Sequence, residues 1–196
     1  TTPVGIFAFS MMVGLETANA MITLVPGSVD ESFVLAWGPY MYFVGGVLQM
    51  TTGILQVFRN NIYGAVVFMV FGAFWFANGT KVILETYFAG TGTEAADLTE
   101  PDPGGSFIRA CYVLAFAVAA LKQTFVLNKL STILVSLLCC KVFFQALAGW
   151  SDVLLWMQVI FGWTTSFFAF YLFLVEFTNQ VYHREVFKTY KLTLIH

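Results

Sequence analysis

Six long apolar stretches, separated by shorter polar ones, dominate the pattern along this chain. The hydrocarbon core of a bilayer is about 30 Å thick, and a helix needs roughly 20 mainly apolar residues to cross it. Each of the six stretches reaches that length. The sequence therefore predicts six transmembrane helices, over residues 4–25, 33–58, 62–87, 107–126, 131–150 and 153–178.

The connections between these stretches differ in length. Only a few residues follow the second, fourth and fifth stretches, so the helices on either side should form antiparallel hairpins. The segment 89–106 is longer and rich in Gly, Thr, Pro and acidic residues, and we expect it to be irregular. The chain thus divides into a helical membrane domain, residues 1–178, and a polar C-terminal tail, residues 179–196.

Composition supports a membrane location. Of the 196 residues, 59% are hydrophobic and 10% are charged, whereas a soluble domain carries about 25% charged residues. So few charges cannot cover the surface of a water-soluble protein, which makes the lipid bilayer the expected partner. A net charge of -2 offers no basic surface for nucleic acid, and we expect no nucleic-acid partner.

The basic residues predict the orientation. In a six-helix chain, both termini lie on the same side as the second and fourth connections. Lys and Arg are more numerous on that side than on the other, which carries Lys81 and Arg109. By the positive-inside rule, both termini should be cytoplasmic, in a plasma membrane or an organelle membrane. The basic residues of the predicted cytoplasmic side are Arg59, Lys122, Lys129, Arg184, Lys188 and Lys191.

Three ionisable residues interrupt the apolar stretches, where each needs a partner or water. Lys141 lies near the middle of the fifth stretch, and Glu16 lies at a similar depth in the first, so the two could pair. One interpretation is a structural ion pair, or a lysine that snorkels to an interface. The other is a cation that attracts an anionic solute into a water-filled path. Glu176 lies near the end of the last stretch, where a helix-end role is expected.

Small residues are concentrated on the second and third stretches, where they would let helix backbones approach closely. The same positions could leave room for a pore. The glycines expected to pack helices are Gly45, Gly46, Gly53, Gly64 and Gly72.

Residues with catalytic or metal-binding chemistry form no recognisable pattern. Cys111, Cys139 and Cys140 lie inside apolar stretches and are expected to be buried thiols. Both histidines, His183 and His196, lie in the tail. Without a Ser-His-Asp set, a metal-ligand spacing or a phosphate loop, we expect no enzyme, no catalytic residue, no metal and no cofactor.

Motifs in four parts of the chain, in the same order, resemble those of the succinate-acetate permease family. The opening resembles that family's Asn-Pro-x-Pro-Leu-Gly-Leu-x-x-Phe, in residues 2–9 (TPVGIFAF). Its aromatic-x-Gly-Gly-x-x-Gln signature is matched by residues 43–49 (FVGGVLQ). Its Asn-Thr-Phe-Gly and Tyr-Gly-x-Phe-Trp elements are matched by residues 61–64 (NIYG) and 71–75 (FGAFW). The last helix closes similarly, in residues 171–176 and Asn179.

The chain also departs from that family's pattern. Pro3 is the single proline of the opening, Phe71 stands in place of a tyrosine, and Gln56 stands where the family often has glutamate. The segment 89–106 is longer than usual, and the fifth helix around Lys141 matches poorly. These differences concern the substrate and the transport activity more than the fold.

The resemblance implies an all-α membrane protein, a six-helix bundle assembled into a homo-hexameric ring. It implies a channel or transporter for small carboxylate anions, acetate or succinate, with proton symport as one possible mode. It also implies a path within each protomer, narrowed by Phe9, Phe71 and a third residue near Leu138, with Leu137 and Cys139 as alternatives. Apolar constrictions can gate by dewetting, and Phe71 lacks a tyrosine's hydroxyl. The candidate contacts along this path are Gln49, Trp75, Asn78, Thr80 and Lys141.

Two other functional classes remain open. A urea or amide channel also uses six helices in a hexameric ring, although the motifs favour the carboxylate family. A non-transporting membrane subunit could have kept the same fold and serve assembly. The departures at Phe71 and Lys141 keep that second alternative open.

Overall fold

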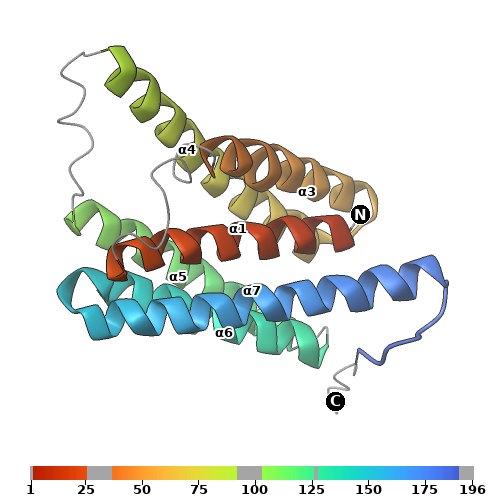
Figure 1. Cartoon of the computed structure of the whole chain (residues 1–196). Coiled ribbons are helices and arrows are strands. Elements are labelled where there is room, and N and C mark those ends of the chain that lie inside the picture. Colours follow the sequence, from red (N-terminus) through yellow and green to blue (C-terminus); the bar gives the residue numbers. More distant parts are fainter. Residues whose placement is uncertain (1, 26–36, 92–102, 126–127, 190–196) are drawn as a thin grey trace.

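The chain folds as a bundle of helices in the computed structural model (Figure 1). The structure describes residues 2–25, 37–91, 103–125 and 128–189. The second helix is continuous from residue 37 to residue 58 but changes its winding along the way. In chain order the elements are α1 (Thr2–Leu24), η1 (Met41–Leu48), α3 (Gln49–Phe58), α4 (Ile62–Thr91), α5 (Pro103–Thr124), α6 (Lys129–Leu147), η3 (Ala148–Trp150) and α7 (Asp152–Val181).

Five helices among the described residues are long and apolar enough to cross a membrane. They cover Thr2–Ile22, Trp37–Phe58, Ile62–Leu84, Lys129–Trp150 and Asp152–Val181. In α5 the apolar part that the structure describes is shorter, Ala110–Thr124. The protein is therefore an all-α integral membrane protein, as the hydrophobic pattern predicts, and five of the six predicted spans reach full length.

The prediction that residues 89–106 are irregular is wrong at both ends of that segment. The helix α4 continues to Thr91, and α5 already begins at Pro103, while residues 92–102 lie outside the described residues. Proline suits the first position of a helix, because the amide hydrogen it lacks would be unpaired there and its fixed φ is helical. The last helix likewise runs past the predicted boundary at residue 178, to Val181.

The expectation of buried thiols is wrong for two of the three cysteines. Cys111 and Cys140 are exposed and Cys139 is half-buried, and all three are free. A thiol is weakly polar and behaves as a small hydrophobe. It can therefore face lipid as readily as protein, and an apolar stretch does not say which.

The helix α1 lies at the centre of the bundle, between the α3–α4 pair and the α6–α7 pair (Figure 1). Its most extensive contacts are with α7. The Ser10 hydroxyl donates to the Ser166 carbonyl at 2.8 Å, and the Ser166 hydroxyl donates to the Ser10 carbonyl at 2.9 Å. Interhelical hydrogen bonds and small residues stabilise helix pairs in lipid, where the hydrophobic effect does not drive association. These reciprocal bonds fix α1 on α7.

The second helix, formed by η1 and α3, is in close backbone contact with α4 at three of the predicted packing glycines. A Cβ at Gly72 would lie 2.7 Å from the Met50 nitrogen, and one at Gly53 would lie 2.9 Å from the Met69 nitrogen. At Gly46 it would lie 2.9 Å from the Phe76 Cα. Only a residue without a side chain fits such spacing.

The other two predicted glycines meet side chains instead. A Cβ at Gly45 would lie 2.6 Å from the Trp75 Cβ, and one at Gly64 would lie 2.7 Å from the Asn61 amide nitrogen. Gly45 and Gly46 belong to η1, which is a π-helix of eight residues. The sequence pattern did not predict this wider winding, which in other proteins is frequent at functional sites.

One end of the bundle is tied together by Gln56. Its amide donates to the Thr2 hydroxyl at 2.8 Å and accepts from the Asn61 amide at 2.9 Å. Asn61 in turn accepts from the Gly64 backbone N–H at 3.0 Å, which caps the start of α4. An amide can donate and accept in this way, whereas an ionised glutamate only accepts. The same end of the bundle holds the C-terminal end of α7 (Figure 1).

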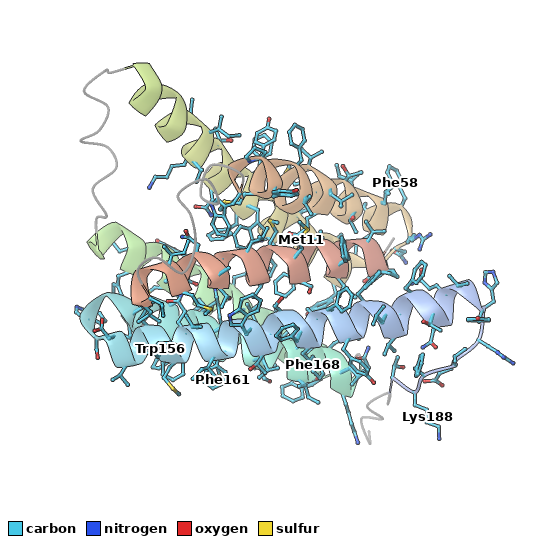
Figure 2. The ribbon with its side chains drawn as sticks, viewed as in Figure 1. Met11, Phe58, Trp156, Phe161, Phe168 and Lys188 are labelled. Carbon is cyan, nitrogen blue, oxygen red and sulfur yellow. The ribbon has the colours of Figure 1, made fainter. Side chains whose placement is uncertain are left out.

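The outer surface is apolar, as lipid contact requires. Phe58 is 81% exposed and points away from the bundle at the end of α3 (Figure 2). In the last turn of α7, the Asn179 side chain accepts from the Val186 and Phe187 backbone N–H groups and donates to the Phe187 carbonyl. The start of the polar tail is thereby folded back on the end of the last helix.

Candidate functional site

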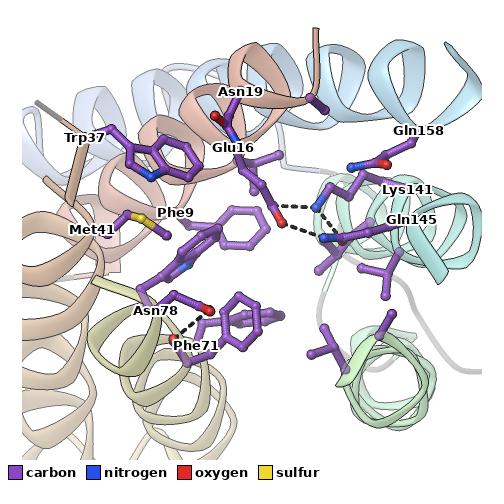
Figure 3. Close-up of a pocket in the computed structure, with 18 of the residues that line it drawn as sticks. Phe9, Glu16, Asn19, Trp37, Met41, Phe71, Asn78, Lys141, Gln145 and Gln158 are labelled. Atoms are coloured by element: carbon purple, nitrogen blue, oxygen red, sulfur yellow. Dashed lines mark hydrogen bonds and ion pairs between the residues drawn. The ribbon is translucent and has the colours of Figure 1, made fainter. Parts of the chain in front are cut away.

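Among the described residues, two large cavities lie inside the bundle, one on each side of the same three side chains. The larger has a volume of about 450 Å³ and the smaller about 290 Å³. Phe9, Phe71 and Leu138 line both. We call these three side chains the partition. Figure 3 shows the larger cavity, with the rings of Phe9 and Phe71 close together at its edge.

The partition is built from three helices that are distant in sequence. Phe9 comes from α1, Phe71 from α4 and Leu138 from α6, and they are only 7%, 6% and 5% exposed. The rings of Phe9 and Phe71 meet edge to face with centroids 5.3 Å apart, a favoured aromatic geometry. The ring of Phe71 also meets the ring of Phe116 from α5 edge to face, with centroids 5.6 Å apart.

The alternatives to Leu138 do not line either cavity. Leu137 and Cys139 are absent from both linings and are half-buried. On a helix, neighbouring residues point in directions about 100° apart, so a one-residue shift in alignment moves a side chain off the cavity. The structure thus brings Phe9, Phe71 and Leu138 together.

Polar side chains from four helices surround the larger cavity. Glu16 and Asn19 come from α1, and Gln158 comes from α7 (Figure 3). The helix α4 supplies Asn78 and Lys81, and α6 supplies Lys141 and Gln145.

Three of these groups form a closed hydrogen-bonded ring, which we call the triad: Glu16, Lys141 and Gln145. The Lys141 ammonium donates to the Glu16 carboxylate, forming an ion pair, and also to the Gln145 carbonyl at 2.7 Å. The Gln145 amide donates to the other Glu16 oxygen at 2.7 Å. The side chain of Lys141 is 3% exposed and that of Glu16 is 15% exposed.

The expected pairing of Lys141 with Glu16 is confirmed, but sequence reasoning missed Gln145. Leu138, Lys141 and Gln145 are spaced three and four residues apart on α6, so they share one helix face. The signal was therefore present: a residue four positions after a buried lysine is its neighbour on the helix. This spacing also places the triad one helical turn from the partition.

The smaller cavity has a different lining. Asn61 and Asn128 cap the N-termini of α4 and α6, with Asn128 accepting from the Ser131 backbone N–H at 2.7 Å. The positive ends of two helix dipoles therefore face this cavity. Glu176 of α7 is its charged residue, among the residues that the structure describes. Glu176 lines a cavity here, beyond the helix-end role expected for it.

The remaining predicted path residues are divided. Trp75 and Asn78 line the larger cavity with Lys141. Gln49 and Thr80 line neither cavity; Gln49 is fully buried, and the Thr80 hydroxyl donates to the Phe76 carbonyl at 2.8 Å. The Gln49 amide and the Trp75 indole N–H have no hydrogen-bond partner among the described residues. Nearly all buried polar groups in proteins are hydrogen-bonded, so these two side chains stand out from the rest of the interior.

No group of three or more His, Cys, Asp or Glu side chains in the described parts of the chain is arranged to hold a metal ion.

No protein-family profile matches this sequence, and no curated protein matches it significantly. Among solved structures, the bacterial acetate channel SatP superposes with a TM-score of 0.79. The comparison covers 96% of this chain and 97% of SatP. The chain has the fold of this acetate channel. The two sequences are 18% identical, so the likeness to SatP establishes the architecture, and the resemblance seen in the motifs is confirmed at that level.

Proposed function

We propose that this protein conducts small carboxylate anions, acetate foremost, through its own helical bundle. The observation that carries the proposal is the pair of cavities that share the partition. An acetate ion fits either volume, and the partition is the barrier between them. The proposal places the chain among the succinate-acetate permeases, by its motifs and by the fold it shares with SatP.

Among the residues that the structure describes, the larger cavity has two lysines against one glutamate, which favours an anion over a cation, whereas in the smaller cavity two helix N-termini stand opposite the single carboxylate of Glu176. Lys81 and Lys141 line the larger cavity together with Glu16. The smaller cavity receives the N-termini of α4 and α6, whose dipoles attract negative charge. Between the cavities the solute must lose water at apolar side chains, and such a constriction gates by dewetting.

The test is uptake of radiolabelled acetate into proteoliposomes that contain the purified protein. Phe71→Ala should raise the uptake rate by about tenfold, which corresponds to lowering the barrier by about 1.4 kcal/mol. Phe71→Tyr adds a hydroxyl that can hydrogen-bond a carboxylate, so it should raise acetate uptake less and change its preference over succinate. The matched control is Phe167→Ala, because Phe167 is 67% exposed on the outer surface.

Four outcomes separate the functional classes and the modes of transport. Background uptake by the wild type and by both Phe71 variants would contradict conduction and favour a structural subunit. Uptake of urea or formamide in preference to acetate would favour the amide-channel class. Acetate uptake that rises when an inward proton gradient is imposed would indicate symport, whereas uptake that follows only the acetate gradient would indicate a channel.

A further inference from the structure

The ion pair at the edge of the larger cavity uses the same chemistry as the proposed solute. Glu16 presents a carboxylate to the Lys141 ammonium, within a cavity of about 450 Å³. Acetate presents the same group, with the same charge and acceptor geometry. Glu16 is the more exposed partner, and both line the cavity. A carboxylate entering the cavity therefore meets Lys141 already bonded to a carboxylate of the protein.

The third member of the triad gives Glu16 a second partner. Gln145 donates to Glu16 through its amide nitrogen and accepts from Lys141 through its carbonyl oxygen. If Glu16 moves away from Lys141, its other oxygen can keep the bond to Gln145. Removing one member of a buried ion pair is costly because it leaves an unpaired charge. Replacing one carboxylate by another on the same ammonium keeps Lys141 paired, and Gln145 still donates a hydrogen bond to the displaced Glu16 carboxylate.

We propose that Lys141 is a carboxylate-binding residue and that Glu16 is its intramolecular competitor. The affinity for a solute anion is then set by how readily the solute replaces Glu16 on the Lys141 ammonium. This inference rests on the proposed function for its choice of solute. It assigns the triad a role in selectivity, one helical turn from the partition formed by Phe9, Phe71 and Leu138.

A purely structural ion pair makes a different prediction. If the pair only stabilises the α1–α6 contact, then neutralising either member should weaken the fold, and acetate binding should fall or stay unchanged in both variants. If Glu16 instead competes with the solute for Lys141, changing Glu16 and changing Lys141 must have opposite effects on acetate binding. Loss of Glu16 should strengthen acetate binding, and loss of Lys141 should abolish it.

The experiment is equilibrium binding of radiolabelled acetate to the detergent-purified protein, which requires no flux. Glu16→Gln keeps the size of the side chain and should lower the acetate Kd by roughly tenfold. Lys141→Gln should remove saturable binding, and the double variant should behave like Lys141→Gln. The controls are Asp152→Asn and Lys122→Gln, exposed charges that line neither cavity, and both should leave the Kd unchanged.

Opposite shifts in the two single variants support the inference. Shifts in the same direction, a Kd unaffected by either change, or no binding by wild type and Glu16→Gln alike would overturn it. If Lys141→Gln does not fold, Lys141→Met and the isosteric Glu16→Gln still test the opposite signs. If the two variants shift the acetate Kd in opposite directions but the liposomes take up no acetate, the inference holds and the proposed conduction is wrong. If the liposomes take up acetate but neither variant changes the Kd, conduction holds and the inference is wrong.

Discussion

At the scale of single residues, the presence or absence of one carbon atom decides how closely two helices approach. The clearest contrast is between Gly72, whose absent Cβ would lie 2.7 Å from the Met50 backbone nitrogen, and Gly149, which has nothing within 4 Å of that position. In lipid the contact between α3 and α4 depends on such close packing, since lipid chains are as apolar as the side chains they would replace.

A pair of glycine variants tests this dependence. Gly72→Val should lower the free energy of unfolding of the purified protein by about 1–3 kcal/mol, and with it the melting temperature, because the added atoms must push α3 and α4 apart. Gly149→Ala should leave stability nearly unchanged, because its methyl group meets open space. Thermal unfolding followed by tryptophan fluorescence measures both. Equal melting temperatures for the two variants would show that the α3–α4 contact tolerates the wider spacing.

How much of the site the sequence could predict varies from residue to residue. Phe9 and Phe71 belong to recognisable motifs, so their assignment needed no geometry. Leu138 lies on a helix with a weak motif match, so three neighbouring positions stayed open until the structure showed which one faces the cavities. Depth alone could pair Glu16 with Lys141, but it could not show that Gln145 bonds to both. Contacts between helices depend on their rotation, which hydrophobicity leaves undetermined.

At the scale of the elements, length and hydrophobicity fixed the helices well and their ends less well. The segment predicted to be irregular begins at Ala89 and includes Pro103, yet α4 contains the first of these residues and α5 the second. A helix near the membrane surface can continue through polar residues, because its backbone bonds are internal and water solvates the side chains. The π-helical winding of η1 could not be predicted from the hydrophobic pattern, because every residue of η1 is also compatible with an α-helix.

The alternation of helices predicts where each connection lies. Gly149 in η3 and Thr189 in the tail are separated by one crossing, α7. With Cys111, Cys139 and Cys140 replaced by alanine, a cysteine at position 149 should react with a membrane-impermeant maleimide applied to intact cells. A cysteine at position 189 should react only after permeabilisation, because the basic residues predict a cytoplasmic tail. Reaction of both from the outside would contradict the topology.

At the scale of the whole molecule, the apolar outer surface must meet either lipid or other copies of the chain. Large exposed side chains cover the outside of several helices, with Phe43 and Phe58 of the second helix among the most exposed. Lipid alone can satisfy such a surface. The resemblance to the succinate-acetate permeases is what implies a ring of six, and we keep the hexamer as a proposal on that basis.

Assembly can be measured directly. Native mass spectrometry of the detergent-solubilised protein should show six copies of the 21.8 kDa chain. The same mass should persist in detergents with different head groups, because tightly packed protein interfaces survive exchange of the surrounding amphiphile. A single monodisperse species with the mass of one chain in every detergent would exclude a stable ring.

The reciprocal serine bonds between α1 and α7 have a consequence for how the bundle could open. Two hydrogen bonds join Ser10 to Ser166 near the middle of both helices, so sliding or rotating one against the other breaks both together. We therefore expect α1 and α7 to move as one rigid unit. Phe9 is carried on that fixed part, whereas Phe71 and Leu138 are carried on α4 and α6. Passage of a solute would then require α4 or α6 to move relative to Phe9, while α1 and α7 keep their positions relative to each other.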